Sequence, residues 1–475
     1  MEMLEEALIL CKFGSFHVRL LLTTLVTSCV AMMVSTTTSY VLPNAECDLD
    51  MDNLQKGLLT SMPFFGQVGA ALFTGFITDA FGRKMFLVAG LFGVFGVLHS
   101  RSCSLCFTTP SVMVSEMIHK NVRDRVLLMV AAFVSISLIL IALISWAILP
   151  QDWNFTIIEG YFYLHSWNIY LYVCSAFSLA AGTSYYFLPE SPKFLLSHGQ
   201  ENESVGSAEE HLPLEYRNAL FEVKNLFRKP LFGRLCLFSV MTFACLLAYS
   251  ALRMWFPQLS TIVENYRVKH NQTDWFCEMI TEYTEESKPI VDYTKDYTNI
   301  TKEFEYNIAE LMLNATSTSR ISGSETYTNG MILGCMSLIG IGISTYTVNF
   351  FGHKLLIVIL LIISATCSLA LYWTNYLIVI ALLISATCGL MQTALSLQQN
   401  LLVRVFPTTL RTLSVSVILM AGRTGSLLGS ILFPVMLSNG CMVPFIALSV
   451  ITLCVACLSY FLPAPNNSKS GGGDK

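Results

Sequence analysis

Apolar runs of about 20 residues recur along most of this chain, and they constrain its fold more than any other feature. They fall at roughly 18–40, 58–78, 85–100, 124–149, 167–188, 233–256, 328–348, 355–373, 377–400, 413–436 and 442–462. A helix of about 20 apolar residues is long enough to cross the hydrocarbon core of a bilayer. Of the 475 residues, 54% are hydrophobic and only 13% are charged. Soluble domains carry about 25% charged residues. The sequence therefore predicts an all-α polytopic membrane protein with about 11 spans.

The charges between the runs predict which loops face the cytoplasm. The loop 41–56 holds four acidic residues against one lysine, which favours the outside. The segments 118–125, 189–232 and 401–412 are rich in Lys and Arg, which is typical of cytoplasmic loops. We therefore expect both termini on the cytoplasmic side.

Glycosylation sequons give an independent indication of the same topology. Four of them fall in loops that we place outside, at Asn154, Asn271, Asn299 and Asn314. Agreement between four sequons and the charge bias is more informative than a single match. A fifth sequon, at Asn466, lies in a tail that we place inside, and we expect it to be unmodified.

Composition and cysteine usage indicate no cofactor. The net charge of −4 gives no indication of nucleic acid as a partner. The 15 cysteines are scattered, mostly within apolar runs, which is typical of small apolar fillers rather than metal ligands. No catalytic nucleophile motif, metal-ligand spacing or phosphate loop stands out, so we predict that the chain is not an enzyme. Cys47 and Cys277 lie in predicted outer loops and could form a disulfide.

Two halves of the chain carry matching elements in matching order. "DAFGRK" at 79–84 and "NFFGHK" at 349–354 each link two apolar runs on the predicted cytoplasmic side. Further along, "EMIHKNVR" begins at Glu116 and "RVFPTTLR" begins at Arg404, and an arginine stands seven residues later in both. Such internal repeats are typical of membrane transporters.

The first of these elements resembles a known family signature. The pattern G-x-x-x-D-x-x-G-R-K in 75–84 resembles the loop between spans two and three of the major facilitator superfamily. "PESPKFLL" at 189–196 is similar to the element that follows the sixth span in sugar-porter and organic-ion relatives. "VLPNAECDLDMDNLQKG" (41–57), "HSWNIYLYV" (165–173) and "MWFP" (254–257) resemble the synaptic vesicle glycoprotein 2 family and its insect relatives. The resemblance implies two helical bundles that rock against each other and expose a central site alternately to each side.

Asp79, with Arg83 and Lys84 beside it, is suited to be a switch in that cycle. A carboxylate at a helix end can hold the cytoplasmic face closed through charge-assisted hydrogen bonds to a neighbouring helix. The plain alternative is that the two cations only follow the positive-inside bias. In the second copy Asn349 replaces the aspartate, and His353 replaces the arginine, so we expect a weaker latch there.

The predicted conformational gate collects the charged, polar and glycine positions of these loops. Its residues are Gly75, Asp79, Gly82, Arg83, Lys84, Glu116, Arg123, Glu190, Asn349, Gly352, Lys354, Arg404 and Arg411. Arg404 stands where the family usually has Glu, which again weakens the second copy.

The first half is too short by about one helix. Asp79 and Glu116 are 37 residues apart, whereas Asn349 and Arg404 are 55 apart. The segment 85–117 must leave the cytoplasmic side and return, and two spans need about 40 residues. We interpret this as a missing fourth helix, from a skipped exon, an incomplete gene model or a decayed paralogue, with 101–117 as a re-entrant or interfacial piece.

By these patterns the chain divides into four regions. They are an N-terminal bundle (1–188), a cytoplasmic linker (189–232), a C-terminal bundle (233–464) with an outer loop at 257–327, and a cytoplasmic tail (465–475). Part of the linker has apolar residues at helical spacing and can lie on the membrane surface. The outer loop is interpreted as a glycosylated, partly disordered segment, or else as a small β-rich ectodomain.

Polar and aromatic residues within the spans are the candidates for a central cavity. They are Phe64, Gln67, Tyr249, Arg253, Trp255 and Gln392. Arg253 lies near the outer end of its predicted span, where an ionisable residue is a functional candidate by default. An aromatic partner such as Trp255 suits a cation or a ring. Ordinary packing is the alternative for each of them.

The function that these patterns favour is secondary-active transport of a small organic solute, including organic ions, by alternating access. The chain would be a multi-pass protein of the plasma membrane or of an intracellular vesicle membrane. The alternative is a membrane glycoprotein of the vesicle or cell surface that does not transport and whose 257–327 loop binds a partner.

Overall fold

The computed structural model describes most of the membrane-embedded part of the chain. It covers residues 14–49, 51, 53–81, 83–96, 120–151, 153, 155–158, 162–189, 231–286, 323–406 and 411–462. The predicted gap in the first half, most of the linker and the tail therefore lie outside the described residues, so the missing fourth helix stays a prediction.

The described residues form α-helices with one short hairpin. The helices are α2 (Ser15–Leu49), α3 (Asn53–Phe81), α4 (Arg83–Gly96), α6 (Lys120–Ile148), α7 (Ser166–Tyr186), α10 (Leu231–His270), α11 (Phe276–Glu286), α13 (Ser324–Ala370), α14 (Leu377–Val405), α15 (Arg411–Ser438) and α16 (Met442–Tyr460). A 3-10 turn, η2 (Leu371–Trp373), follows α13. Strands β1 (Phe155–Ile158) and β2 (Phe162–Leu164) pair antiparallel between α6 and α7.

The predicted apolar segments are helical wherever the structure describes them, which confirms the all-α polytopic class. Within the described part of the chain, eight helical segments are long and apolar enough to cross a membrane. The hairpin of β1 and β2, which the sequence pattern did not predict, lies in a connecting loop and leaves this class unchanged.

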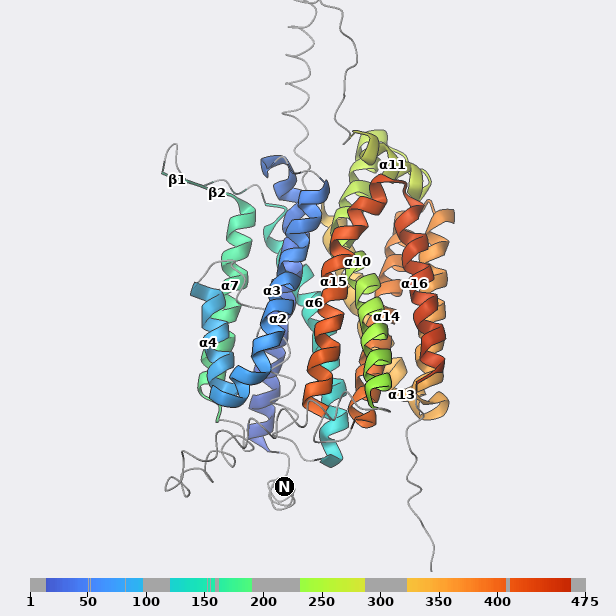
Figure 1. Cartoon of the computed structure of the whole chain (residues 1–475). Helices are drawn as coiled ribbons and strands as arrows, with labels where there is room; N and C mark the ends of the chain where they lie inside the picture. The colour runs from blue at the N-terminus through green and yellow to red at the C-terminus, as the bar shows by residue number, and fades with distance from the viewer. Residues whose placement is uncertain are drawn as a thin grey trace, which may run out of the picture.

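The long helices stand side by side in two groups (Figure 1). In the first, α2 packs on α6 and α7, and α4 packs on α7; in the second, α10 packs on α15, and α13 packs on α14 and α16. The groups meet where α3 contacts α15, α6 contacts α13, and α2 contacts α10. We call the end that carries α11 and the hairpin the α11 end, and the end where α3 meets α4 the junction end (Figure 1).

Glycines allow the closest helix contact in the second group. A Cβ atom at Gly425 or Gly429 of α15 would collide with backbone carbonyl oxygens of α10, those of Phe243 and Leu247. Small residues at such positions let helix backbones approach closely, which is how membrane helices gain packing energy. The spacing of these glycines therefore fixes how α15 lies on α10.

Buried hydroxyl groups of α2 are satisfied within the helix itself. Thr24 Oγ1 donates to the Leu20 carbonyl oxygen at 2.7 Å, and Thr27 Oγ1 donates to that of Thr23 at 2.8 Å. Because the hydrocarbon core offers no water, such i−4 bonds let a Thr-rich run span the membrane.

Two helices extend well beyond their predicted ends. α2 continues through Pro43 to Leu49, and α10 continues through Pro257 to His270, although both stretches were predicted as loops. The physical reason is that an apolar run predicts where a helix crosses the membrane, whereas the helix itself can continue beyond the hydrocarbon core. In α10 the residues 257–263 are buried against neighbouring elements, and this packing keeps the helix intact past its proline.

The part of the outer loop that the structure describes is helical. It comprises the end of α10, a short turn and the helix α11, so neither a β-rich fold nor a disordered chain holds for 257–286. Residues 287–322 lie outside the described residues.

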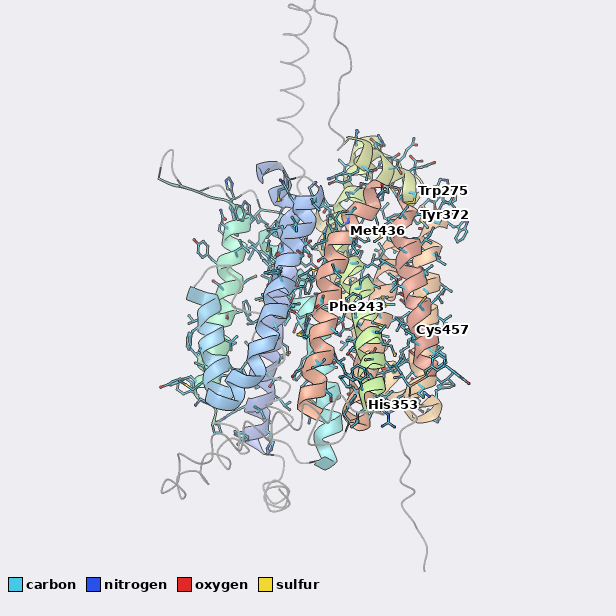
Figure 2. All side chains as sticks on the ribbon, in the orientation of Figure 1. Phe243, Trp275, His353, Tyr372, Met436 and Cys457 are labelled. Atoms are coloured by element: carbon cyan, nitrogen blue, oxygen red, sulfur yellow. A yellow bond between two sulfur atoms is a disulfide. The ribbon has the colours of Figure 1, made fainter. Side chains whose placement is uncertain are left out.

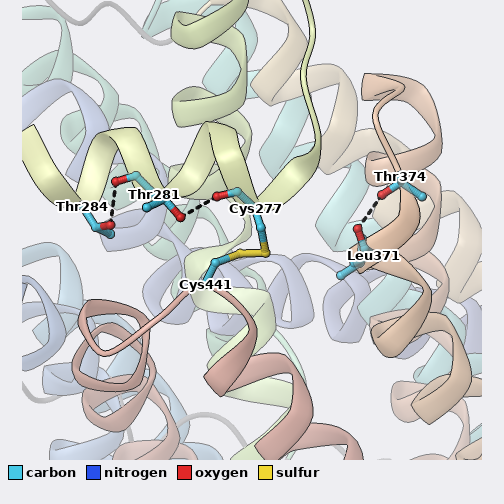
Figure 3. The surroundings of a disulfide bond; sticks show 6 residues. All are labelled: Cys277, Thr281, Thr284, Leu371, Thr374 and Cys441. Carbon is cyan, nitrogen blue, oxygen red and sulfur yellow. Dashed lines mark hydrogen bonds between the residues drawn. A yellow bond between two sulfur atoms is a disulfide. The ribbon is translucent and has the colours of Figure 1, made fainter.

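The disulfide that was considered between Cys47 and Cys277 is wrong. Cys277, in α11, bonds instead to Cys441 at the start of α16, with the two Cα atoms 5.5 Å apart (Figure 3). α11 lies over the second group of helices, where the Phe276 ring packs on the Phe445 ring of α16 at 5.5 Å. This packing brings Cys277 to Cys441, 164 residues away, and fastens α11 to the bundle.

Candidate functional site

The first gate motif lies at the junction end, across the break between α3 and α4. Gly75 and Asp79 fall in the last two turns of α3, and Arg83 and Lys84 open α4. Of these side chains the structure describes Lys84, whose Nζ lies 5.6 Å from the centroid of the Tyr186 ring. This cation–π contact joins the start of α4 to the end of α7.

The second motif explains why the repeat keeps its glycine. Gly352 interrupts α13 with φ +73° and ψ 162°, a conformation open almost exclusively to glycine. His353, the next residue, lies at the junction end (Figure 2). Gly82 holds the equivalent sequence position in the first motif, between the last residue of α3 and the first of α4, and lies outside the described residues. Both copies thus turn the chain at the same end of the molecule.

The other predicted gate residues lie at helix ends or outside the described residues. Arg123 is in the first turn of α6, Arg404 in the last turn of α14, and Arg411 opens α15. Asn349 and Lys354 flank the kink in α13. Gly82, Glu116 and Glu190 lie outside the described residues. The structure describes no side-chain contact that joins this set into one latch, so the gate stays a prediction.

Arg253 is the most unusual residue at the centre of the molecule. It lies in the middle of α10 with 6% of its surface exposed. Its Nη1 contacts the Met32 sulfur of α2 at 3.6 Å, its guanidinium carbon lies 5.4 Å from the Tyr249 ring centroid, and its Nε has no hydrogen-bond partner. A guanidinium carries five N–H donors, and sulfur is a weak acceptor. The sequence prediction of an ionisable residue inside a span therefore found a buried, under-satisfied cation between the two groups of helices.

The other cavity candidates divide between this centre and ordinary packing. Tyr249 lies one turn from Arg253 on the same face of α10, as the ring contact shows. Trp255 faces α15 instead: its Nε1 donates to the Ser430 carbonyl oxygen at 3.1 Å, and its ring stacks on Phe433. Trp255 therefore does not contact the Arg253 guanidinium, and its contacts are those of ordinary helix packing.

Three further candidates have different surroundings. Phe64 is 1% exposed and belongs to the main apolar core, whereas Gln67 is 4% exposed and its Oε1 has no hydrogen-bond partner. Gln392 is half-buried on α14, one turn from Cys388, which lies near Arg253.

A second arginine at this depth was not among the predicted site residues. Arg423 lies within α15 and is close enough to Arg253 for their charges to interact. The signal was present, because an ionisable residue inside an apolar run marks a functional candidate by the same rule that selected Arg253. Tyr40 of α2 was also missed; it lies near Arg253, and its ring stacks on Tyr327 of α13 at 6.1 Å.

Among the described residues, three glycines make close contacts between the two helix groups toward the α11 end. A Cβ atom at Gly334 of α13 would lie 2.5 Å from Ile139 Cγ1 of α6, and one at Gly330 would collide with the Tyr40 hydroxyl of α2. A Cβ atom at Gly57 of α3 would lie 3.0 Å from Pro434 Cγ of α15. All three glycines lie in the part of their helix nearest the α11 end, so this half of the interface is tightly packed.

α11 adds a polar contact across the same interface. The Tyr283 hydroxyl accepts hydrogen bonds from Lys56 Nζ of α3 and from Gln258 Nε2 of α10, both at 3.3 Å. Lys56 also lies 5.8 Å from the Tyr283 ring centroid. Because α3 and α10 belong to different helix groups, one side chain of α11 bridges the two groups.

These features define a polytopic membrane protein with two packed helical groups, a repeated turn at one end and a buried cation at their boundary. A family model described as Major Facilitator Superfamily matches residues 24–271 and 297–475. The chain belongs to the Major Facilitator Superfamily.

Curated relatives and solved structures agree with this placement. The chain is 29% identical over 184 residues to synaptic vesicle glycoprotein 2C of Mus musculus, and 28% identical over 191 residues to synaptic vesicle glycoprotein 2A of Rattus norvegicus. Each alignment covers 35% of this chain and 25% of the relative, so the match spans about a quarter of those proteins.

Solved structures of the xylose transporter XylE from E. coli share the fold. A partially occluded inward open form gives a TM-score of 0.62 at 12% identity, covering 95% of this chain and all of that one. An inward open form gives 0.60 at 14% identity, covering 94% and 97%. The resemblance to the superfamily and to synaptic vesicle glycoprotein 2 is confirmed, and at this identity the solved structures show the fold alone.

Proposed function

We propose that the chain is a secondary-active transporter of a small organic solute that works by alternating access. The fold is that of membrane transporters, and the observation that carries the proposal is the close packing between the helix groups at the α11 end, among the side chains that the structure describes. Glycine contacts and the Tyr283 bridge close the α11 end, while the repeated charged turns lie at the other end. A protein that alternates between two states needs contacts that are made at one end and released at the other.

The predicted gate has a defined part in this proposal. Asp79 and the cations beside it would hold the junction end closed in the opposite state, in which the α11 end opens. The proposed bundles are residues 1–188 and 233–464, joined by the linker 189–232. On the sequon and charge indications, the α11 end faces outward, and Asn271, an exposed residue in the turn between α10 and α11, would carry a glycan.

The described part of the outer loop supports gating over partner binding. α11 is disulfide-bonded to α16 and hydrogen-bonded across the interface, so its position is coupled to the packing of the bundles. The alternative of a non-transporting glycoprotein predicts no coupling between α11 and any solute flux.

An uptake screen tests the proposal. Proteoliposomes that contain the purified protein would be incubated with a mixture of small organic acids, amines, sugars and nucleosides, and their contents measured by mass spectrometry. We expect at least one solute to be enriched over protein-free liposomes, with the enrichment reduced by Asp79→Ala. No enrichment of any solute from a properly inserted protein would overturn the transport proposal.

A further inference from the structure

The charge at the centre of the molecule is entirely positive among the side chains that the structure describes. The described carboxylates are Glu264, Asp274, Glu278, Glu282 and Glu325, and all of them lie at the α11 end. Arg253 and Arg423 lie instead in the middle of α10 and α15, and their like charges interact. A buried cation normally has an anionic partner, because removing an unpaired charge from water is costly.

Arg253 presents unused hydrogen-bond donors at this point. The guanidinium of Arg253 makes a cation–π contact with the Tyr249 ring, and its Nη1 contacts only the Met32 sulfur. The buried Nε makes no hydrogen bond. The Nε and Nη donors along one edge of a guanidinium match the two oxygens of a carboxylate, and this bidentate pair is among the strongest hydrogen-bonded contacts in proteins.

The residues around Arg253 come from both helix groups. A site for a transported solute needs this arrangement, because movement between the groups must expose it. Met32 and Tyr40 belong to α2, Tyr249 belongs to α10, and Cys388 belongs to α14. Met32 is a flexible, weakly interacting partner, which a ligand group can displace at little cost. The site can therefore be exposed when α2 moves away from α10.

We propose that the solute carries a carboxylate and that Arg253 binds it. This inference rests on the proposed transport function and narrows its substrate class to small organic acids. It excludes organic cations, which the sequence left open, because the buried Arg253 charge repels them. The hydroxyl groups of Tyr40 and Tyr249 would supply further donors to the acid.

Matched pairs of ligands separate charge from shape. The purified protein would be heated in the presence of benzoate or benzamide, nicotinate or nicotinamide, and phenylacetate or phenylacetamide, and its melting temperature measured. We expect at least one acid to raise the melting temperature by about 2 °C or more at a concentration well above its dissociation constant. Its amide should give less than half that shift.

Variants then assign the effect to the site. Arg253→Gln should abolish the shift given by the acid, Arg253→Lys should reduce it, and Arg19→Gln, at an exposed arginine of α2, should retain it. A second variant, measured without ligand, covers the case in which Arg253→Gln does not fold. The melting temperature of Arg253→Met should be no lower than that of the wild type, because the substitution removes an uncompensated charge. A structural arginine would instead give a clearly lower melting temperature.

The outcomes distinguish this inference from the proposed function. If no acid stabilises the wild type more than its amide does, or if the shift persists in Arg253→Gln, the carboxylate site is wrong even when the proteoliposomes take up a solute. If an acid binds through Arg253 but no solute accumulates, the site stands and the transport proposal fails.

Discussion

The two ends of this molecule are built differently. The α11 end is held by glycine contacts between the bundles, by the Tyr283 bridge and by a disulfide that fastens α11 to α16. The junction end carries the passage from α3 to α4 and the kink of α13 at Gly352, where the two repeated motifs lie. One end thus depends on close packing and a covalent bond, and the other, by our proposal, on charge. The comparison teaches that the two states of such a protein need not be stabilised by the same kind of interaction.

Removing the disulfide should have the largest effect. Cys277→Ser should lower the free energy of unfolding by about 2–4 kcal/mol, because the bond closes a long loop between α11 and α16. Thermal denaturation of the purified protein, with and without reductant, measures the loss. Cys441→Ser should give the same loss, and the double variant should add nothing.

Cys454→Ser is the matched control, since Cys454 is an exposed free cysteine of α16. It should leave the melting temperature unchanged. Unequal losses in the two single variants would show that α11 is not held by this bond.

Asp79→Ala should weaken the junction end by about 1.5–3 kcal/mol, the typical loss of a charge-assisted hydrogen bond. That is enough to change the ratio of the two states more than tenfold, in favour of the state closed at the α11 end. Transport should fall while surface expression persists. Wild-type uptake together with unchanged accessibility of cysteines at the junction end would remove Asp79 from the gate.

Gly334→Val should act in the opposite direction. The added atoms would press on Ile139 of α6, whose backbone nitrogen lies 3.0 Å from an added Cβ, and overpacking of this kind costs about 1–3 kcal/mol. The state closed at the α11 end should therefore become less populated. Gly342→Val, in the same helix but with open space around the glycine, is the control. Labelling of an introduced cysteine at the α11 end measures the shift, and equal labelling of both variants would show that this contact does not hold the end closed.

Tyr283→Phe should have the smallest effect in the same direction. It removes the hydroxyl that accepts from Lys56 and Gln258, and a typical hydrogen bond contributes about 0.5–1.5 kcal/mol. Labelling at the α11 end should rise a few fold. Tyr346→Phe, at an exposed tyrosine of α13, should not change it. A rise in labelling as large as that of Gly334→Val would mean that α11, rather than the glycine contacts, closes this end.

The sequence predicted the helices well and their ends poorly, for a physical reason. The apolar runs report where the chain crosses hydrocarbon, and each of them is helical where the structure describes it. The extension of α10 beyond Pro257 and the helix α11 depend on packing against other elements, which hydropathy does not record. The partner of Cys277 was missed for the same reason, because it is set by where α11 lies.

The site was predicted in part. Arg253 stood out because a charge inside an apolar run is rare, and Arg423 should have been selected by the same rule. Tyr40 and Tyr283 carry no such signal in the sequence. Tyr40 contacts Gly330, and Tyr283 accepts from Lys56, and both contacts exist only in the folded molecule. Trp255, chosen for its ring, packs on α15 instead.

Alternating access is tested most directly by measuring distances across both ends of the same molecule. Spin labels would be placed on exposed residues, at Leu54 and Trp275 for the α11 end and at Val18 and Phe350 for the junction end, with the free cysteines replaced. Double electron–electron resonance would be recorded for the otherwise unaltered protein, Gly334→Val and Asp79→Ala. We expect Gly334→Val to lengthen the first distance and shorten the second, and Asp79→Ala to do the reverse. Two distances that change in the same sense, or independently of each other, would contradict the account.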